Sequence, residues 1–158
     1  PLMHVIAAKA AAFKEALSDD FKEYSRQTLL NAKAICSSLK DNNFEVVSGN
    51  TSCHMLLIDL SNKEVTGKLA EKVLDDAGIT CNKNSIPFDN KSPFVTSGIR
   101  IGTAAGTTRG FKEQQFKYIG DLISEVIDSL KKHDDKILKT TELVRRKVLD
   151  LCNKFPLY

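Results

Sequence analysis

Helix-forming segments at both ends of the chain enclose short β-rich runs, and this order restricts the possible architectures. Apolar side chains recur at helical spacing in the helix-forming segments, whereas β-branched and aliphatic residues dominate the short runs. The predicted helices cover residues 2–17, 18–40, 66–77, 112–132 and 136–153, and the predicted strands cover residues 45–47, 55–60, 79–81 and 99–102. This order predicts an α/β layer in which helices cover one side of a small, mostly antiparallel sheet.

Local signals mark where several of these elements begin and end. Ser18, followed by two aspartates, is a typical N-cap with carboxylates in the first helical turn. Gly78 favours a left-handed end for the helix over 66–77. The polar stretch 133–135 is expected to separate the last two helices.

Composition indicates one globular unit and excludes several partners. A chain of 158 residues with 42% hydrophobic content can bury one well-packed core. Its 23 basic residues are interleaved with 20 acidic ones, so the net charge of +3 lacks the concentrated basic surface of a nucleic-acid-binding protein. No apolar run approaches the ~20 residues of a membrane span. We therefore expect neither nucleic acid nor membrane as a partner.

The cysteines and histidines offer no metal-binding pattern. Cys36, Cys53, Cys81 and Cys152 form no CxxC pair, and three histidines are scattered along the chain. We therefore expect no metal site, and we expect a reduced, cytoplasmic protein.

A polar loop runs from Asn82 past two prolines into a short strand that carries Arg100 among apolar neighbours. A guanidinium cannot lose its charge when it is buried, so it needs a carboxylate or phosphate partner. A bound ligand could supply that group. Alternatively, Arg100 could pair with a structural acid such as Asp59 or Asp89.

Two neighbouring residues of this loop also have structural alternatives. Asn84 could simply form a turn before the proline. Lys83 could suggest a covalent cofactor link, but a lysine in a polar loop normally stays a solvated cation.

Several segments, in the same order along the chain, resemble serine hydroxymethyltransferase of the bacterial type. They are Pro1–Ala10, Phe21–Tyr24, Asn82–Pro87, Ser92–Thr103 and Arg109–Phe111. The resemblance implies the C-terminal small domain of a fold-type-I, aspartate-aminotransferase-like enzyme that uses pyridoxal phosphate. Residues 1–17 would then be a connecting helix from a large domain, and residues 18–158 the small domain.

The family's activity interconverts serine plus tetrahydrofolate and glycine plus 5,10-methylenetetrahydrofolate, in one-carbon metabolism. The resemblance assigns Arg100 to the carboxylate of the amino-acid substrate. It assigns Asn84, together with Ser92, Pro93 and Phe94, to the folate site. Two single positions, Phe88 and Ala104, and the stretch 50–54 depart from the family pattern.

The same resemblance places the cofactor-binding lysine before Pro1, so this chain should carry no catalytic or cofactor-binding residue. The intact enzyme would be a homodimer of chains well over twice this length, and the isolated chain would be inactive. Two rival functions remain. One is another fold-type-I enzyme, such as an aminotransferase, and the other is a free-standing anion-binding or interaction module.

Overall fold

The computed structural model describes residues 1–131 and 134–157. Of the predicted break at 133–135, His133 lies outside the described residues, whereas residues 134 and 135 belong to the last helix, which therefore begins earlier than expected. The helices are α1 (Met3–Ala16), α2 (Asp19–Asp41), α3 (Gly67–Asp76), α4 (Ala104–Thr108), α5 (Glu113–Ser129) and α6 (Asp134–Lys154), with a short 3-10 helix at Ser61–Lys63. The strands are β1 (Glu45–Val46), β2 (Met55–Asp59), β3 (Asn82–Asn84) and β4 (Gly98–Gly102).

The four strands form one sheet in the order β1-β2-β4-β3, and every neighbouring pair in it is antiparallel. β2 and β4 lie at the centre, with Leu57 opposite Arg100. On the outer side of β4, Asn82 of β3 lies opposite the same arginine. The predicted fold class, a small antiparallel sheet with helices on one side, is confirmed.

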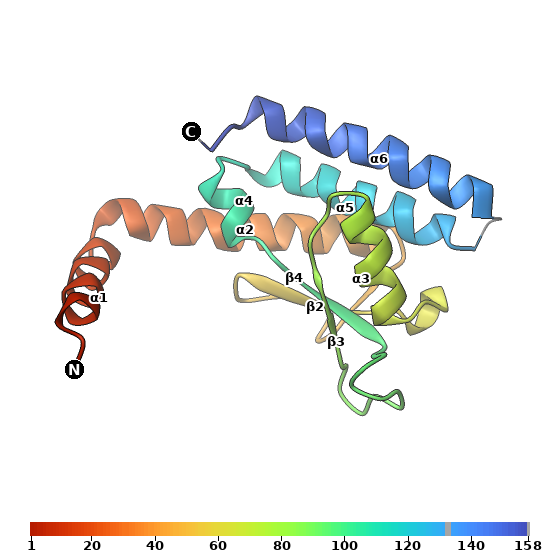
Figure 1. Cartoon of the computed structure of the whole chain (residues 1–158), viewed down its shortest axis with the longest axis horizontal. Coiled ribbons are helices and arrows are strands. Elements are labelled where there is room, and N and C mark those ends of the chain that lie inside the picture. The colour runs from red at the N-terminus through yellow and green to blue at the C-terminus, as the bar shows by residue number, and fades with distance from the viewer. Residues whose placement is uncertain (132–133, 158) are drawn as a thin grey trace.

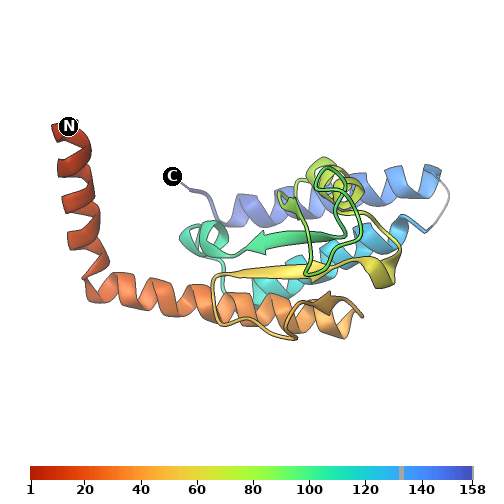
Figure 2. The same cartoon turned by 90° about the horizontal axis from the view of Figure 1, so that it is seen from below.

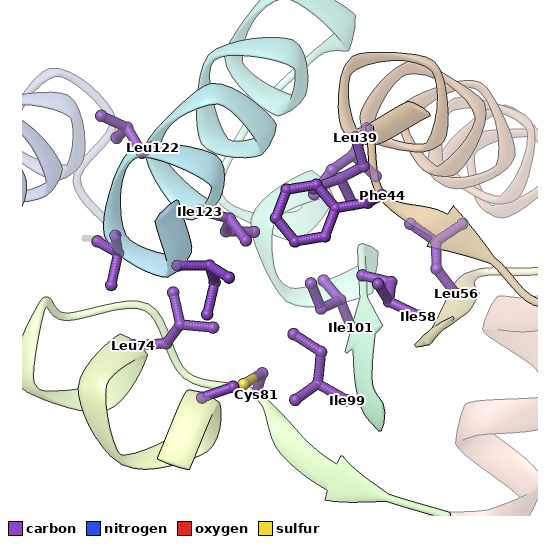
Figure 3. Packing of buried hydrophobic residues seen from close by; sticks show 14 of the residues in the cluster. Leu39, Phe44, Leu56, Ile58, Leu74, Cys81, Ile99, Ile101, Leu122 and Ile123 are labelled. Carbon is purple, nitrogen blue, oxygen red and sulfur yellow. The ribbon is translucent and has the colours of Figure 1, made fainter. Parts of the chain in front are cut away.

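Helices α2, α3 and α5 cover one face of the sheet, and α6 packs on the far side of α5 (Figure 1). We call this side the covered face. Buried hydrophobic side chains from the strands and from the helices that cover them meet there, as Figure 3 shows for ten labelled residues. Ile58 of β2 and Ile99 of β4 lie directly opposite each other and are both fully buried. On the opposite side of the sheet, the open face, the described residues form no such layer of helices.

Helix α1 stands apart from this packed body (Figure 2). It contains no buried residue. The large apolar side chains of Ile6 and Phe13 on the helix, and of Leu17 just after its end, are exposed. The next helix begins as predicted, because the Ser18 side chain accepts a hydrogen bond from the Phe21 backbone N–H (3.2 Å).

Buried polar contacts fix α2 against the segment that follows β4. The amide of Asn31, which has no exposed surface, donates to Thr107 Oγ1 and to the Phe111 carbonyl, both at 2.9 Å. The Thr103 hydroxyl lies within hydrogen-bonding distance of the Thr28 carbonyl (3.0 Å). The end of β4 is therefore anchored, and this anchoring holds the strand that carries Arg100.

Two sequence expectations need correction. The strand predicted over 79–81 lies instead at Asn82–Asn84. The Ile79 N–H donates to the Leu74 carbonyl (2.8 Å) and Gly78 has a φ of 80°, so residues 78 and 79 complete the end of α3. The short helix α4 also had no counterpart in the sequence prediction.

Candidate functional site

Arg100 projects from the open face because side chains alternate along β4. Ile99 and Ile101 are buried on the covered face, and Arg100 between them is exposed. Its guanidinium Nη2 donates to Asn82 Oδ1 at 3.4 Å, a long contact with a neutral amide. In the described part of the chain, Arg100 belongs to no ion pair.

The two acids that could have paired with Arg100 are engaged elsewhere. Asp59 lies on the open face, but its Oδ1 accepts a hydrogen bond from the Ser61 N–H (2.8 Å). Asp89 accepts hydrogen bonds from its own loop, including one from the Ser97 hydroxyl (2.7 Å). The guanidinium is thus available to an external carboxylate, the partner that its planar donors fit best.

Asn84 joins Arg100 on the open face through the strand register. Asn84 lies opposite Gly98 and Asn82 lies opposite Arg100, so the two asparagines share one face of β3 with the guanidinium of β4. The Asn84 side-chain amide donates to the Ser85 carbonyl (2.8 Å), which leaves its carbonyl oxygen available. Sequence reasoning had placed Asn84 in a loop, whereas it ends an edge strand.

A cleft of about 480 Å³ opens on this face, and we call it the open-face cleft. It is lined by the segment between β1 and β2, by β2, and by Asn84 and Arg100. The Thr51 hydroxyl shapes this lining, because it lies 2.7 Å from the Met55 carbonyl and accepts from the Cys53 N–H at 3.2 Å. The arrangement can hold an anion at Arg100 beside amide and hydroxyl groups.

Sequence reasoning did not assign Thr51, Ser52 and Cys53 to a site, although they line the cleft. The available signal was the turn-forming Ser48–Gly49 pair, and in the structure both residues have left-handed φ values, of 66° and 70°. Such a turn can fold the segment back over β2.

Three predicted site residues do not line the open-face cleft: Ser92, Pro93 and Phe94. They lie in the connection between β3 and β4, and all three are exposed, with 80% of Phe94 accessible to solvent. The predicted site residues therefore fall into two groups, one in the cleft and one on the adjoining loop.

Lys83 forms an ion pair with α3. Its Nζ lies 3.4 Å from Glu71 Oε2, and its backbone N–H donates to Glu71 Oε1 at 2.9 Å. That backbone donor is the main reason why the pKa of Glu71 lies below its ordinary value. Lys83 is accordingly a charged structural partner of α3.

The described residues carry neither a cluster of metal ligands nor a membrane-spanning helix. Residues 1–131 and 136–157 contain no cluster of three or more histidine, cysteine or acidic side chains able to hold a metal ion. Within the same ranges, no helix is long and apolar enough to cross a membrane.

Comparison with known proteins shows the family of this chain. The family model described as serine hydroxymethyltransferase matches residues 1–123. The serine hydroxymethyltransferases of Novosphingobium aromaticivorans and Bartonella henselae are 55% and 56% identical to the chain over its whole length. That of Rickettsia akari is 51% identical. The chain spans 36% of the Novosphingobium relative and 37% of the other two. This chain belongs to the serine hydroxymethyltransferase family.

Proposed function

We propose that the chain is the C-terminal portion of an enzyme that interconverts serine plus tetrahydrofolate and glycine plus 5,10-methylenetetrahydrofolate. The observation that carries the proposal is an exposed guanidinium at Arg100 without a carboxylate partner among the described residues, in a chain matched throughout by relatives named for this activity. Serine and glycine both carry the carboxylate that such a guanidinium binds.

In this proposal, Arg100 binds and orients the amino acid. Two parallel N–H donors of a guanidinium can hold a carboxylate in one plane, which fixes the substrate's direction in a way that a lysine cannot. Asn82 limits the rotation of the guanidinium through its contact with Nη2.

We assign tetrahydrofolate to the neighbouring surface formed by Asn84 and by Ser92, Pro93 and Phe94. Asn84 offers a side-chain carbonyl that can accept from an amino group on a planar heterocycle. Phe94 offers an exposed aromatic ring on a loop that starts two residues after Asn84.

Pyridoxal phosphate supplies an electron sink that stabilises negative charge on the amino acid's α-carbon. Two lysines that are not fully exposed, Lys83 and Lys63, are already held by acidic partners. Lys83 is paired with Glu71, and Lys63 donates to Asp128 Oδ1 (3.0 Å) and to the Asn42 carbonyl (2.9 Å). We therefore assign the covalent cofactor site to sequence outside this chain.

The domain boundaries remain part of the same proposal. Residues 1–17 would connect to a large domain, because α1 exposes its apolar side chains to solvent, and residues 18–158 would form the small domain. A homodimeric assembly and a cytoplasmic location complete the proposal.

The first experiment measures the reading frame and activity of the full-length enzyme that carries this chain. We expect folate-dependent conversion of serine to glycine and no comparable transamination with 2-oxo acids. Predominant transamination would favour the rival aminotransferase. A reading frame that begins near Pro1 would instead favour a free-standing binding module.

A second experiment tests the isolated chain. We expect no hydroxymethyl transfer and no stoichiometric covalent binding of pyridoxal phosphate, followed by absorbance and by borohydride reduction. A saturable absorbance band at about one equivalent, trapped on one lysine, would contradict this assignment of the cofactor site.

A further inference from the structure

The loop of residues 86–97 contains two non-glycine residues in left-handed backbone conformations. Phe88 has a φ of 59° and Thr96 a φ of 60°. This conformation is unfavourable for any side chain with a Cβ, and more so for a β-branched threonine. Such residues persist only where the surrounding contacts determine the backbone. The contacts of this loop therefore need an explanation.

One carboxylate holds the loop together. Asp89 Oδ2 accepts from the backbone N–H groups of Ile86 (3.2 Å) and Ser97 (2.8 Å). Its Oδ1 accepts from the Lys91 N–H (2.9 Å) and from the Ser97 hydroxyl (2.7 Å). These four donors use the acceptor capacity of a carboxylate and join the first residue of the loop to the last.

The charge of this carboxylate is stable across the physiological range. The Lys91 N–H, followed by the Ser97 hydroxyl, holds the pKa of Asp89 well below its ordinary value. The group therefore remains an acceptor for all four donors and never becomes a donor itself.

The start of α3 holds the C-terminal end of the loop. The Gly67 N–H donates to the Thr96 carbonyl (3.0 Å), and the Lys68 N–H donates to the Val95 carbonyl (2.9 Å). A Cβ at Gly67 would collide with Thr96 Oγ1 and with the Gly98 carbonyl oxygen, so only glycine allows this approach. The loop is thus fixed by Asp89 from within and by α3 from outside.

This fixed loop presents apolar surface to solvent. Phe94 is 80% exposed and Phe88 is fully exposed. The contacts that order the loop do not bury either ring, so they do not serve the hydrophobic core. Ordering a binding surface in advance reduces the conformational entropy that a ligand would otherwise have to remove.

We propose that Asp89 is a positioning residue for tetrahydrofolate, because it orders the 86–97 loop that carries Ser92, Pro93 and Phe94 before the co-substrate binds. The proposal rests on the proposed function and names a residue that does not itself touch the ligand. Arg100 lies on β4 and makes no contact with Asp89, so serine binding should be independent of this role.

The test uses the full-length enzyme with three variants. Asp89→Asn replaces one acceptor oxygen by an NH₂ group, which then faces N–H donors. Ser97→Ala removes one of the four hydrogen bonds and keeps the carboxylate. Asp41→Asn is the matched control, because Asp41 is an exposed residue at the end of α2.

For Asp89→Asn we expect tetrahydrofolate affinity to fall about tenfold, while serine affinity and kcat change by less than about twofold. Ser97→Ala should shift tetrahydrofolate affinity in the same direction by a smaller factor, and Asp41→Asn should shift neither affinity. Hydrogen exchange at the amides of Lys91 and Ser97 should accelerate in Asp89→Asn, in the absence of any ligand.

Unchanged tetrahydrofolate affinity in a folded Asp89→Asn enzyme would overturn the proposal, and so would an equal loss of serine and tetrahydrofolate affinity. If Asp89→Asn does not fold, Ser97→Ala decides by the same comparison. A wild-type enzyme that lacks folate-dependent activity would instead refute the proposed function, so the two failures are distinguishable.

Discussion

The two faces of the sheet differ although the same strands build both. On the covered face, Ile58 and Ile99 are sealed by helices, whereas on the open face Leu57 and Arg100 line a cleft. Adjacent residues of β4 therefore have separate tasks, because one side chain stabilises the fold and the next is available to a ligand. This separation implies that stability and binding can be altered independently, and five predictions test it.

The largest expected difference is in the reaction rates of the buried cysteines and of Cys53 at the open-face cleft. Burial raises the pKa of Cys81 to about 12, and burial also raises the pKa of Cys36, whereas Cys53 is exposed at the open-face cleft. Only thiolates react with iodoacetamide, so at pH 8 we expect Cys53 to be labelled about 10³-fold faster than Cys81. Peptide mass spectrometry measures the rates, and labelling in denaturant is the control. Equal rates in the folded chain would contradict the burial of Cys81.

The raised pKa of Cys81 also predicts how the stability of the chain depends on pH. The folded state keeps the Cys81 proton up to about pH 12, whereas an ordinary thiol loses it near 9.0. The stabilising contribution of this proton is complete below pH 9.0 and is lost as the pH rises towards 12. Urea unfolding of the wild type and Cys81→Ala at several pH values isolates this contribution. A difference between the two proteins that stays constant from neutral to alkaline pH would contradict it.

The second largest effect concerns core packing on the covered face. Ile99→Ala should lower the free energy of unfolding by about 3 kcal/mol, because it removes fully buried apolar atoms and leaves a cavity. Arg100→Ala, its neighbour on the strand, is the matched control and should change it by less than about 0.5 kcal/mol. Urea unfolding followed by circular dichroism measures both. A large loss of stability in Arg100→Ala would mean that the two faces are not separable.

The fourth prediction addresses binding on the open face. In the full-length enzyme, Arg100→Lys keeps the charge but loses the planar pair of donors, so serine and glycine binding should weaken by about 2 kcal/mol or more. The thermal stability of the variant should match the wild type, and calorimetric titration with serine measures the affinity. Serine affinity close to that of the wild type would refute the assigned role of Arg100.

The smallest effect involves α1, whose apolar side chains lack the cover that helices give the sheet. Phe13 is 67% exposed, so we expect the isolated chain to self-associate through α1. Phe13→Gln should weaken this association about tenfold, whereas Leu138→Gln on α6, with 65% exposure at that leucine, should not. Equilibrium sedimentation that shows only a 17.5 kDa monomer at roughly 50 µM would argue against the idea.

The fold was largely predictable because its signals are local. Apolar periodicity located the long helices, Ser18 marked the start of α2, and alternation identified β4. The position of β3 could not be read in this way, because Asn82–Asn84 has low intrinsic strand preference and becomes a strand by pairing with β4. α4 is also short, and it ends beside the buried contact between Asn31 and Thr107.

The candidate site was only partly predictable for a similar reason. Arg100 could be identified because a charge stood out in an apolar strand. Thr51 and Cys53 could not, because their place in the open-face cleft depends on how the segment between β1 and β2 folds over the sheet. The role of Asp89 also required coordinates, since its partners at 86, 91 and 97 are defined by the loop's closed shape.

The strand order β1-β2-β4-β3 has a consequence for how the chain acquires its structure. The central pair joins Met55 to Gly102, so β2 has no inner partner until nearly fifty further residues have been synthesised. Helix α2 acquires one of its partners later still, because the buried side-chain amide of Asn31 donates a hydrogen bond to the carbonyl of Phe111. Contacts this distant in sequence slow folding, since a long loop must close before they form. On the ribosome, the part of α2 that packs on α5 therefore stays unprotected until α5 emerges.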